Sequence, residues 1–507
     1  MQNSAQNIEQ QQYKVWTRST LSRLLWSGLL GLFTTALFTG GVSAQTLTGG
    51  TLYINGSFNN RGTITVNNHI VNNTSGPVSV LPGTVNSTVV LAGAANANGH
   101  TIYGGGSISF YRLDLRGGRE TRLKVNVEVT NRLRVGYAGN TYTAADSGFT
   151  IENHTLTIDS LATYAGTAAV TFSGGTVAYT GVNTQVTINK TSGVRYGTLT
   201  FSGVGAKSIS AAATGPDTAA TLTQTGGQLS ILGNFDITGS GSFIDLGAIS
   251  ATKILRLTAP ATSCSVTSMN NSGTGTFENA STAGTLTLSG AAANTGTITN
   301  SSTGTITFAN NLTGTGTVSQ TAGGTRNVGG AFTQGTYSLT GTNGTVIYNS
   351  TAAQSVIGTS YYNMTISTTG GNATASAAIT LIGNLLVNSN STLDMAGFTS
   401  SSFPGASNDN AGTIRWSGNN VFVRSAGTTG TTEFYSSAAG NVAAGTSYRD
   451  ILFTGTNKTI NNAFTAAGNM TVNSGASVTV GSISIQINGD VVNAGSLTNN
   501  GTINIGN

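Results

Sequence analysis

The sequence predicts an all-β fold, and three observations lead to this prediction. Units of glycine, threonine and alternating aliphatic residues recur from Thr46 onward, for example Gly62–Val66, Gly284–Leu288 and Gly304–Phe308. Alternation with a period of two is typical of a half-buried strand, because successive side chains point to opposite faces. Helical periodicity is nearly absent after residue 45. Glycine and asparagine between the units are expected to form turns, since both tolerate positive φ.

A longer repeat predicts how these strands are organised. Four segments combine a Gly-Thr-rich strand with a second strand, and their starts near residues 87, 175, 344 and 430 are 88, 169 and 86 residues apart. The middle gap is close to twice the others, so a degenerate copy is expected near residue 260. No proline-rich or charged linker separates the copies. This continuity favours an elongated β-solenoid with repeats of about 85 residues over a string of β-sandwich domains.

Residues 1–44 have the composition of a secretory signal peptide. A polar stretch with three basic residues precedes a mostly apolar run, residues 24–38, and small residues follow as far as Ala44. We expect cleavage after Ala44, which leaves residues 45–507 as the repetitive region. An uncleaved membrane anchor is the alternative, although the apolar run is shorter than the ~20 residues of a membrane span. No later run has that length, so no transmembrane span is expected after cleavage.

Composition excludes several functional classes. Charged residues make up only 7% of the 507 residues, and without residues 1–44 the chain has 18 basic and 15 acidic residues. A nearly neutral chain of this kind argues against a general nucleic-acid surface. The single cysteine, Cys264, excludes an intramolecular disulfide framework and a cysteine-based zinc site. We interpret it as a buried or incidental thiol.

Two motifs resemble those of a known class of proteins. The first is the pattern Gly-Thr-Val-x-Tyr at 344–348 followed by Tyr-x-Asn-Met-Thr-Ile at 361–366, and the second is Asn-x-Gly-Thr-Ile at Asn60–Ile64, Asn294–Ile298 and Asn499–Ile503. Together they resemble secreted surface repeat proteins of Gram-negative bacteria, above all β-helical adhesins of the autotransporter-passenger type. The resemblance implies an extracellular, elongated protein with a structural or adhesive role. It carries no catalytic residues.

Residue types that support catalysis or metal binding are scattered. The three histidines, at positions 69, 100 and 154, lack the spacing of metal ligands, and no calcium-binding motif is present. Asp236 and Asp245 could lie on adjacent strands, but we interpret them as turn or surface acids. Asp394 fits a solvent-facing strand position. We therefore expect no catalytic residues, no metal site and no cofactor.

One concentration of basic residues interrupts this neutral sequence. Within it, Leu123 and Val125 alternate with charged residues, which predicts a strand with its charged face in solvent. Arginine pairs well with carboxylate and phosphate groups, so Arg116, Arg119, Arg122 and Lys124 are candidate contacts for an acidic glycan or lipopolysaccharide. The alternative is a solvated face that discourages aggregation. The full set is Arg112, Arg116, Arg119, Arg122, Lys124, Arg132 and Arg134.

These observations predict a secreted bacterial surface protein with a structural or adhesive role and no enzymatic activity. Its expected partners are glycans, host or neighbouring cell surfaces, or its own copies. Two alternatives stay open. A β-helical carbohydrate-active enzyme, either a polysaccharide lyase or a hydrolase, requires clustered carboxylates facing a groove. A self-assembling extracellular filament subunit is motivated by Gly501–Asn507, which resembles part of another repeat.

Overall fold

In the computed structural model, strands are the regular secondary structure of the described residues. The described residues are 35–38, 47–82, 87–92, 100–116, 121–135, 149–164, 171–187, 194–210, 216–260, 263–398, 409–417, 429–442 and 447–506. They contain strands and turns but no helix, and hence none that has the length and apolar character of a membrane span. The chain divides into two compact units, residues 1–177 and 178–507. Of residues 1–44, only strand β1 (Thr35–Phe38) is described, so cleavage of a leader stays a prediction.

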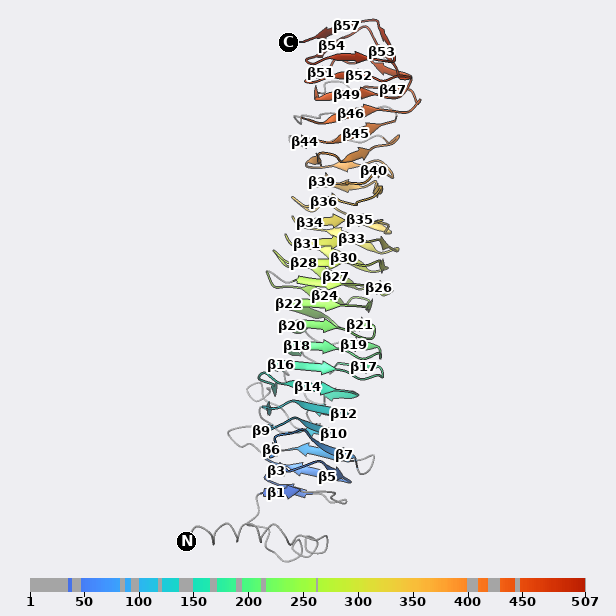
Figure 1. Cartoon of the computed structure of the whole chain (residues 1–507). Coiled ribbons are helices and arrows are strands. Elements are labelled where there is room, and N and C mark those ends of the chain that lie inside the picture. The colour runs from blue at the N-terminus through green and yellow to red at the C-terminus, as the bar shows by residue number, and fades with distance from the viewer. Residues whose placement is uncertain are drawn as a thin grey trace, which may run out of the picture. The chain divides into compact units, whose positions relative to one another are not determined.

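Strands of the first unit form three parallel stacks, and the chain visits each stack once per turn (Figure 1). The first stack contains β1, β3 (Thr51–Ile54), β6 (His69–Asn72), β9 (His100–Gly104), β11 (Thr121–Leu123), β13 (Phe149–Thr150) and the start of β16 (Thr171–Tyr179). The second contains β4 (Phe58–Asn60), β7 (Val78–Pro82), the first halves of β10 (Ile108–Leu115) and β12 (Val127–Val135), and β14 (Thr155–Ile158). The third contains β2 (Leu47–Gly49), β5 (Thr63–Val66), β8 (Thr88–Leu91), the second halves of β10 and β12, and β15 (Leu161–Tyr164).

The second unit begins with the same arrangement. One stack contains the first parts of β18 (Arg195–Phe201), β20 (Asp217–Gln224) and β22 (Phe235–Phe243), then β24 (Ile254–Leu257), β27 (Thr276–Asn279), β30 (Thr297–Asn300), β33 (Thr317–Gln320) and β35 (Thr336–Ser338). Another contains the second parts of β18, β20 and β22, then β25 (Ser263–Val266), β28 (Thr285–Leu288), β31 (Thr305–Phe308), β34 (Thr325–Val328), β36 (Thr345–Tyr348), β39 (Asn363–Ile366), β42 (Leu385–Val387) and β44 (Asp409–Asn410). A third contains β17 (Gln185–Val186), β19 (Lys207–Ile209), β21 (Leu229–Ile231), β23 (Leu246–Ile249), β26 (Met269–Asn271), β29 (Ala292–Asn294) and β32 (Leu312–Thr313).

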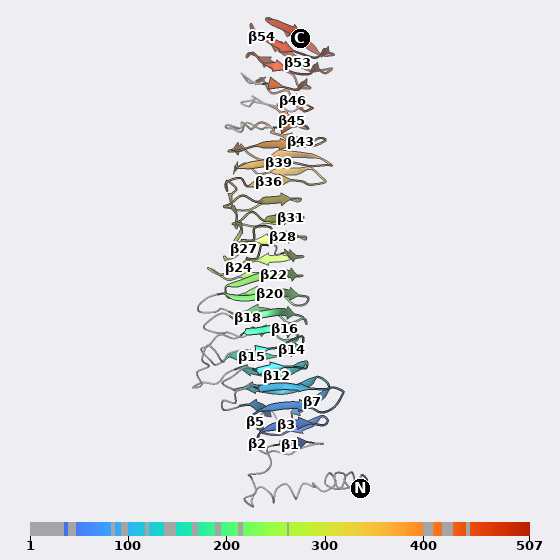
Figure 2. The same ribbon diagram turned by 90° about the vertical axis from the view of Figure 1, so that its left-hand side faces the viewer.

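Towards the C-terminus of the second unit the strands again lie above one another, and a view from the side shows the same stacking (Figure 2). An eight-stranded sheet contains β37 (Gln354–Val356), β40 (Asn372–Ala375), β43 (Thr392–Asp394), β45 (Thr413–Trp416), β46 (Thr431–Phe434), β49 (Asp450–Phe453), β52 (Met470–Val472) and β55 (Val491–Asn493). Two four-stranded sheets contain β47 (Gly440–Asn441), β50 (Lys458–Ile460), β53 (Ser477–Val480) and β56 (Ser496–Asn499), and β48 (Ser447–Tyr448), β51 (Thr465–Ala466), β54 (Ser484–Ile487) and β57 (Thr502–Ile505). A pair contains β38 (Ser360–Tyr361) and β41 (Thr380–Leu381).

Parallel pairing of this kind confirms the predicted β-solenoid. The alternative of β-sandwich domains is wrong, because sandwiches consist of antiparallel sheets. Adjacent strands of a stack are one turn apart along the solenoid. The two strands of a repeated segment pair with each other in this way. Val346 of β36 pairs with Met364 of β39, and Thr432 of β46 pairs with Ile451 of β49.

The core consists of inward side chains stacked from turn to turn. In β28, β31 and β36 the residues alternate between partly exposed and buried, and Leu286, Ile306 and Val346 are 0% exposed. These inward residues are in register through successive parallel pairs. Each turn therefore buries its apolar side against its two neighbours, which is how solenoids gain stability.

The Asn-x-Gly-Thr motif has a structural explanation that sequence analysis did not provide. Asn294 is fully buried at the end of β29, and its Nδ2 donates to the carbonyl of Gly296 at 2.9 Å. Asn60 accepts from the Gly62 N–H, 3.1 Å away, in the equivalent motif. A Cβ on Gly316 would lie 2.3 Å from the carbonyl oxygen of Gly296 and 2.5 Å from the Asn294 amide nitrogen, so the backbone of the preceding turn requires glycine here. The motif thus marks corners with an inward, hydrogen-bonded asparagine.

Candidate functional site

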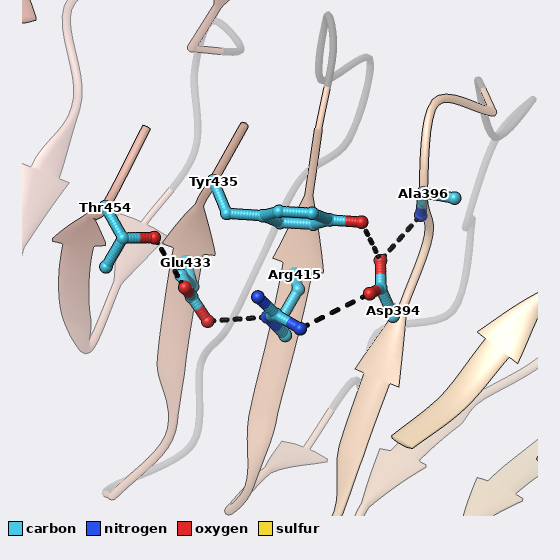
Figure 3. Close-up of polar contacts among 6 residues, drawn as sticks. All are labelled: Asp394, Ala396, Arg415, Glu433, Tyr435 and Thr454. Carbon is cyan, nitrogen blue, oxygen red and sulfur yellow. Dashed lines mark hydrogen bonds and ion pairs between the residues drawn. The ribbon is translucent and has the colours of Figure 1, made fainter. Parts of the chain in front are cut away.

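Charged side chains of the second unit meet in a ladder across three successive strands. Asp394 ends β43, and its register partner on β45 is Arg415, whose own partner on β46 is Glu433. All three point away from the core, since Leu393 and Phe434 beside them are 0% exposed and face inward. Adjacent strands are ~4.8 Å apart, so side chains on the same face come into contact. Figure 3 shows the arginine between the two carboxylates.

Arg415 bridges both acids. Its Nε donates to Oε2 of Glu433 at 2.7 Å, and its Nη1 lies 3.4 Å from Oδ2 of Asp394. Thr454, one turn further, donates from Oγ1 to the other oxygen of Glu433 at 2.6 Å. Burial opposes the charge on Arg415, but the hydrogen bond and attraction of the two carboxylates outweigh it and raise the pKa of the guanidinium.

Tyr435 covers the ladder. Its hydroxyl donates to Oδ1 of Asp394 at 2.7 Å, and the Arg415 guanidinium carbon lies 4.1 Å from the centroid of its ring (Figure 3). The second contact is a cation–π interaction. Burial, together with the hydrogen bond to Asp394 and its charge, raises the pKa of Tyr435 to about 12. The Ala396 N–H donates to the same oxygen of Asp394 at 2.8 Å.

These contacts correct the expectation for Asp394. The sequence correctly predicts that its side chain points away from the core, but the residue is only 6% exposed because Tyr435 and the backbone at Ala396 cover it. Both carboxylates of the ladder bind the same arginine. The arrangement can therefore clamp three turns together.

A second ladder repeats this arrangement. Asp236 of β22, Arg256 of β24 and Glu278 of β27 are successive register partners, and Arg256 Nε donates to Oε2 of Glu278 at 2.7 Å. Ser301, one turn further, donates to the other oxygen of Glu278, as Thr454 does in the first ladder. Burial and the nearby Glu278 charge raise the pKa of Asp236, although Arg256 opposes the shift.

Asp236 and Asp245 do not lie on adjacent strands, which excludes the possibility that the sequence left open beside the preferred interpretation as turn or surface acids. Both belong to one stretch of chain: Asp236 is the second residue of β22, and Asp245 follows the end of that strand. Asp245 accepts hydrogen bonds from the Gln228 amide at 3.3 and 3.4 Å. The acid that shares the outward face of Asp236 is Glu278, two strands away, and sequence analysis did not identify it.

The basic residues of the first unit are divided among different stacks. Arg122 is exposed on β11 of the first stack, and Lys124 is exposed at the corner that follows. Arg116 follows the second half of β10, in the third stack, and Arg119 lies outside the described residues. The segment is not one strand as predicted, because the corner separates β11 from β12. The inward aliphatic residues are buried as expected: Leu123, Val125, Val127 and Val129.

A different group of arginines converges on the third stack. Arg116 and Arg132 both contact the carboxylate of Asp114, at 3.0 and 3.2 Å, and Asp114 is 1% exposed. Arg134 is the register partner of Asp114, and Arg112 is the partner of Arg132. Sequence analysis missed the central role of Asp114. The available signal was its i, i+2 spacing to Arg112 and Arg116, which places the three side chains on one face of a strand.

The remaining candidates behave as structural residues. Cys264 is buried on β25, and burial strongly raises the pKa of its thiol, so it is poorly suited to be a nucleophile. His100 is buried with its Nδ1 2.9 Å from the carbonyl of Asn68, and burial lowers its pKa. No group of three histidine, cysteine, aspartate or glutamate residues within the described ranges could hold a metal ion.

The described residues form a parallel β-solenoid with charged clusters on some of its outward strand faces. No family model matches the chain, and no curated protein or solved structure is significantly similar to it.

Proposed function

We propose that this chain is a secreted repeat protein of a bacterial surface, with a structural and adhesive role and no enzymatic activity. The observation that carries the proposal is the repetition of outward side chains along the solenoid. Thr285, Thr305, Thr325 and Thr345 occupy one register position on four successive strands, and all are partly exposed. A repeated surface of this kind can make many weak contacts with a repetitive partner such as a polysaccharide, and their avidity is large.

The charge arrangement supports this role over that of a carbohydrate-active enzyme. General acid and base catalysis requires carboxylates that face a substrate. In both ladders the arginine lies between the two acids and donates from its Nε to the glutamate at 2.7 Å. The geometry therefore uses these carboxylates to join turns.

A binding assay with purified protein tests the proposal. Retention of the full chain on immobilised polysaccharides and on bacterial or animal cells should exceed that of a non-adhesive control protein of similar charge. The same polysaccharides are incubated with the protein and assayed for new reducing ends and unsaturated sugars. Product formation that disappears in an Asp394→Asn, Glu433→Gln variant would support the enzyme instead. Filaments in electron micrographs of the purified protein would favour the assembly alternative.

A further inference from the structure

Four arginines share one outward face of the third stack in the first unit. The second halves of β10 and β12 are adjacent parallel strands, with Leu113 and Leu133 facing the core. Their outward residues are Arg112 and Asp114 on one strand and Arg132 and Arg134 on the next, with Arg116 following β10. Four arginines and one acid on a single strand face are a marked concentration of charge for a chain with 7% charged residues. We call these five residues the Asp114 cluster.

The cluster is held in place before any ligand arrives. Both oxygens of the buried Asp114 carboxylate are used: Oδ2 by Arg116 and Oδ1 by Arg132. The Nε of Arg112 donates to Oδ1 of Asn131 at 2.7 Å. About a third of the Arg116 and Arg132 side chains remains exposed, 34% and 32%. Fixing side chains in advance lowers the entropic cost of binding.

We propose that the Asp114 cluster binds an acidic polysaccharide through its carboxylate or sulfate groups. This inference rests on the adhesive function proposed above and names its ligand class. Arginine is suited to the task because its planar fork binds oxyanions through two parallel hydrogen bonds. The cluster extends over two strands ~4.8 Å apart. It can therefore contact consecutive charged groups of a linear polymer laid across the turns.

The cluster differs from the ladders in how its charge is balanced. Arg415 has two carboxylate partners, whereas two arginines share the single carboxylate of Asp114. Arg112 is held by a neutral amide, which leaves its charge uncompensated by that contact. Attraction for a polyanion is consequently expected at this face of the first unit, whereas the ladder at Arg415 has two carboxylates for one arginine and should not attract one.

The test measures affinity of the full chain for heparin, which supplies sulfate, and polygalacturonate, which supplies carboxylate, with dextran as the neutral control. Wild-type protein should bind one or both acidic polymers and not dextran. An Arg112→Gln, Arg134→Gln variant, which leaves both Asp114 ion pairs intact, should bind at least tenfold more weakly and with reduced salt dependence. The matched control, Arg122→Gln with Lys124→Gln, removes the same charge elsewhere in this unit and should change affinity less than twofold. Equal losses in the two variants would overturn the site, as would equal binding of single-stranded DNA.

Asp114→Asn separates prearranged geometry from net charge. The substitution adds one positive charge, so simple electrostatic attraction predicts tighter binding. If the carboxylate organises the arginines, binding should instead weaken at least threefold in protein whose circular dichroism and thermal midpoint match those of the wild type. Tighter binding would overturn the prearranged site. If Asp114→Asn does not fold, Arg112→Gln, Arg134→Gln still decides the proposal.

Cell adhesion distinguishes failure of this inference from failure of the proposed function. If wild-type protein adheres to cells but binds neither acidic polymer, the Asp114 cluster is not the adhesive site and the broader function stands. If it neither adheres nor binds, both proposals fail. If the Arg112→Gln, Arg134→Gln variant loses both properties together, the cluster is the adhesive surface.

Discussion

The two charged ladders of the second unit differ in the contacts that their aspartates receive. Each contains an aspartate, an arginine and a glutamate on successive strands, with the arginine Nε 2.7 Å from the glutamate. The residue two positions after the glutamate is Tyr435 in one ladder and Ala280 in the other. Tyr435 gives Asp394 a hydrogen bond and Arg415 an aromatic face. Asp236 has no such tyrosine, and its pKa is raised by burial. The same acid–base order thus gives one satisfied and one strained aspartate.

The largest effect should come from removing the central arginine. Arg415→Met leaves two poorly exposed carboxylates, two strands apart, without the arginine that lies between them, so we expect unfolding free energy to fall by about 3 kcal/mol. Arg256→Met should cost about 1 kcal/mol, because Glu278 is its one ion-pair partner among the described residues. Urea unfolding followed by circular dichroism measures the difference. Arg195→Met, which replaces an exposed arginine of the same unit, is the control. Equal losses for Arg415 and Arg256 would contradict the comparison.

Replacing a buried arginine that has no acidic partner among the described residues should raise stability instead of lowering it. Arg326 points into the core, in register between the buried Ile306 and Val346 of the neighbouring turns, and is 0% exposed. Its Nη2 donates to the carbonyl of Ser319, but Nε and Nη1 have no hydrogen-bond partner among the described residues. Burial lowers its pKa to about 9.

Arg326→Met should therefore stabilise the second unit by about 2 kcal/mol, since well-packed apolar residues often replace buried charges favourably. The urea midpoint of the variant, compared with that of Arg195→Met, measures the gain. A loss of stability would mean that the buried guanidinium makes a net favourable contribution to the fold.

Removing the tyrosine hydroxyl should have a moderate effect that depends on pH. Tyr435→Phe deletes a hydrogen bond to a charged group, so we expect a loss of about 1.5 kcal/mol at neutral pH. The pKa of Tyr435 is raised from 10 to about 12 in the folded protein. Its contribution is thus fully present below pH 10 and is lost as the pH rises through about 12.

The difference in stability between wild type and Tyr435→Phe measures this directly, because the other tyrosines are common to both. The difference should be constant from pH 7 to 9 and then decrease towards pH 12. A difference that does not change over the alkaline range would show that the hydroxyl is not held by Asp394 in solution.

The fold was predictable from sequence because strand alternation and corner glycines are local signals. Which acid meets which arginine was not predictable, since turn length varies. Asp394 and Arg415 are 21 residues apart, whereas Arg415 and Glu433 are 18 apart and Arg256 and Glu278 are 22 apart. Tyr435 covers Asp394 from 41 residues away, two strands further along the stack. The register that brings these residues together depends on corner conformations that no short motif records.

The smallest effect should come from neutralising the strained aspartate. The pKa of Asp236 is raised above its ordinary value of 3.8, so ionisation costs free energy in the folded state. The folded protein is favoured below pH 3.8, and this advantage is lost as the pH rises through the shifted pKa. Asp236→Asn cannot ionise and should be more stable than wild type at pH 7, by about 0.5 kcal/mol because the site is half-exposed. The gain should vanish below pH 3.8.

Two matched variants show whether this small gain arises from the site. Asp245→Asn makes the same change in charge beyond the far end of β22, where the carboxylate accepts from the exposed Gln228 amide, and should leave stability unchanged. Asp394→Asn should lower stability, since that carboxylate accepts from Tyr435 and Ala396 and faces Arg415. Opposite signs at Asp236 and Asp394 would show that the contacts of the aspartate, and not the order of charges, decide whether it stabilises the solenoid. Equal gains at Asp236 and Asp245 would instead assign the effect to net charge.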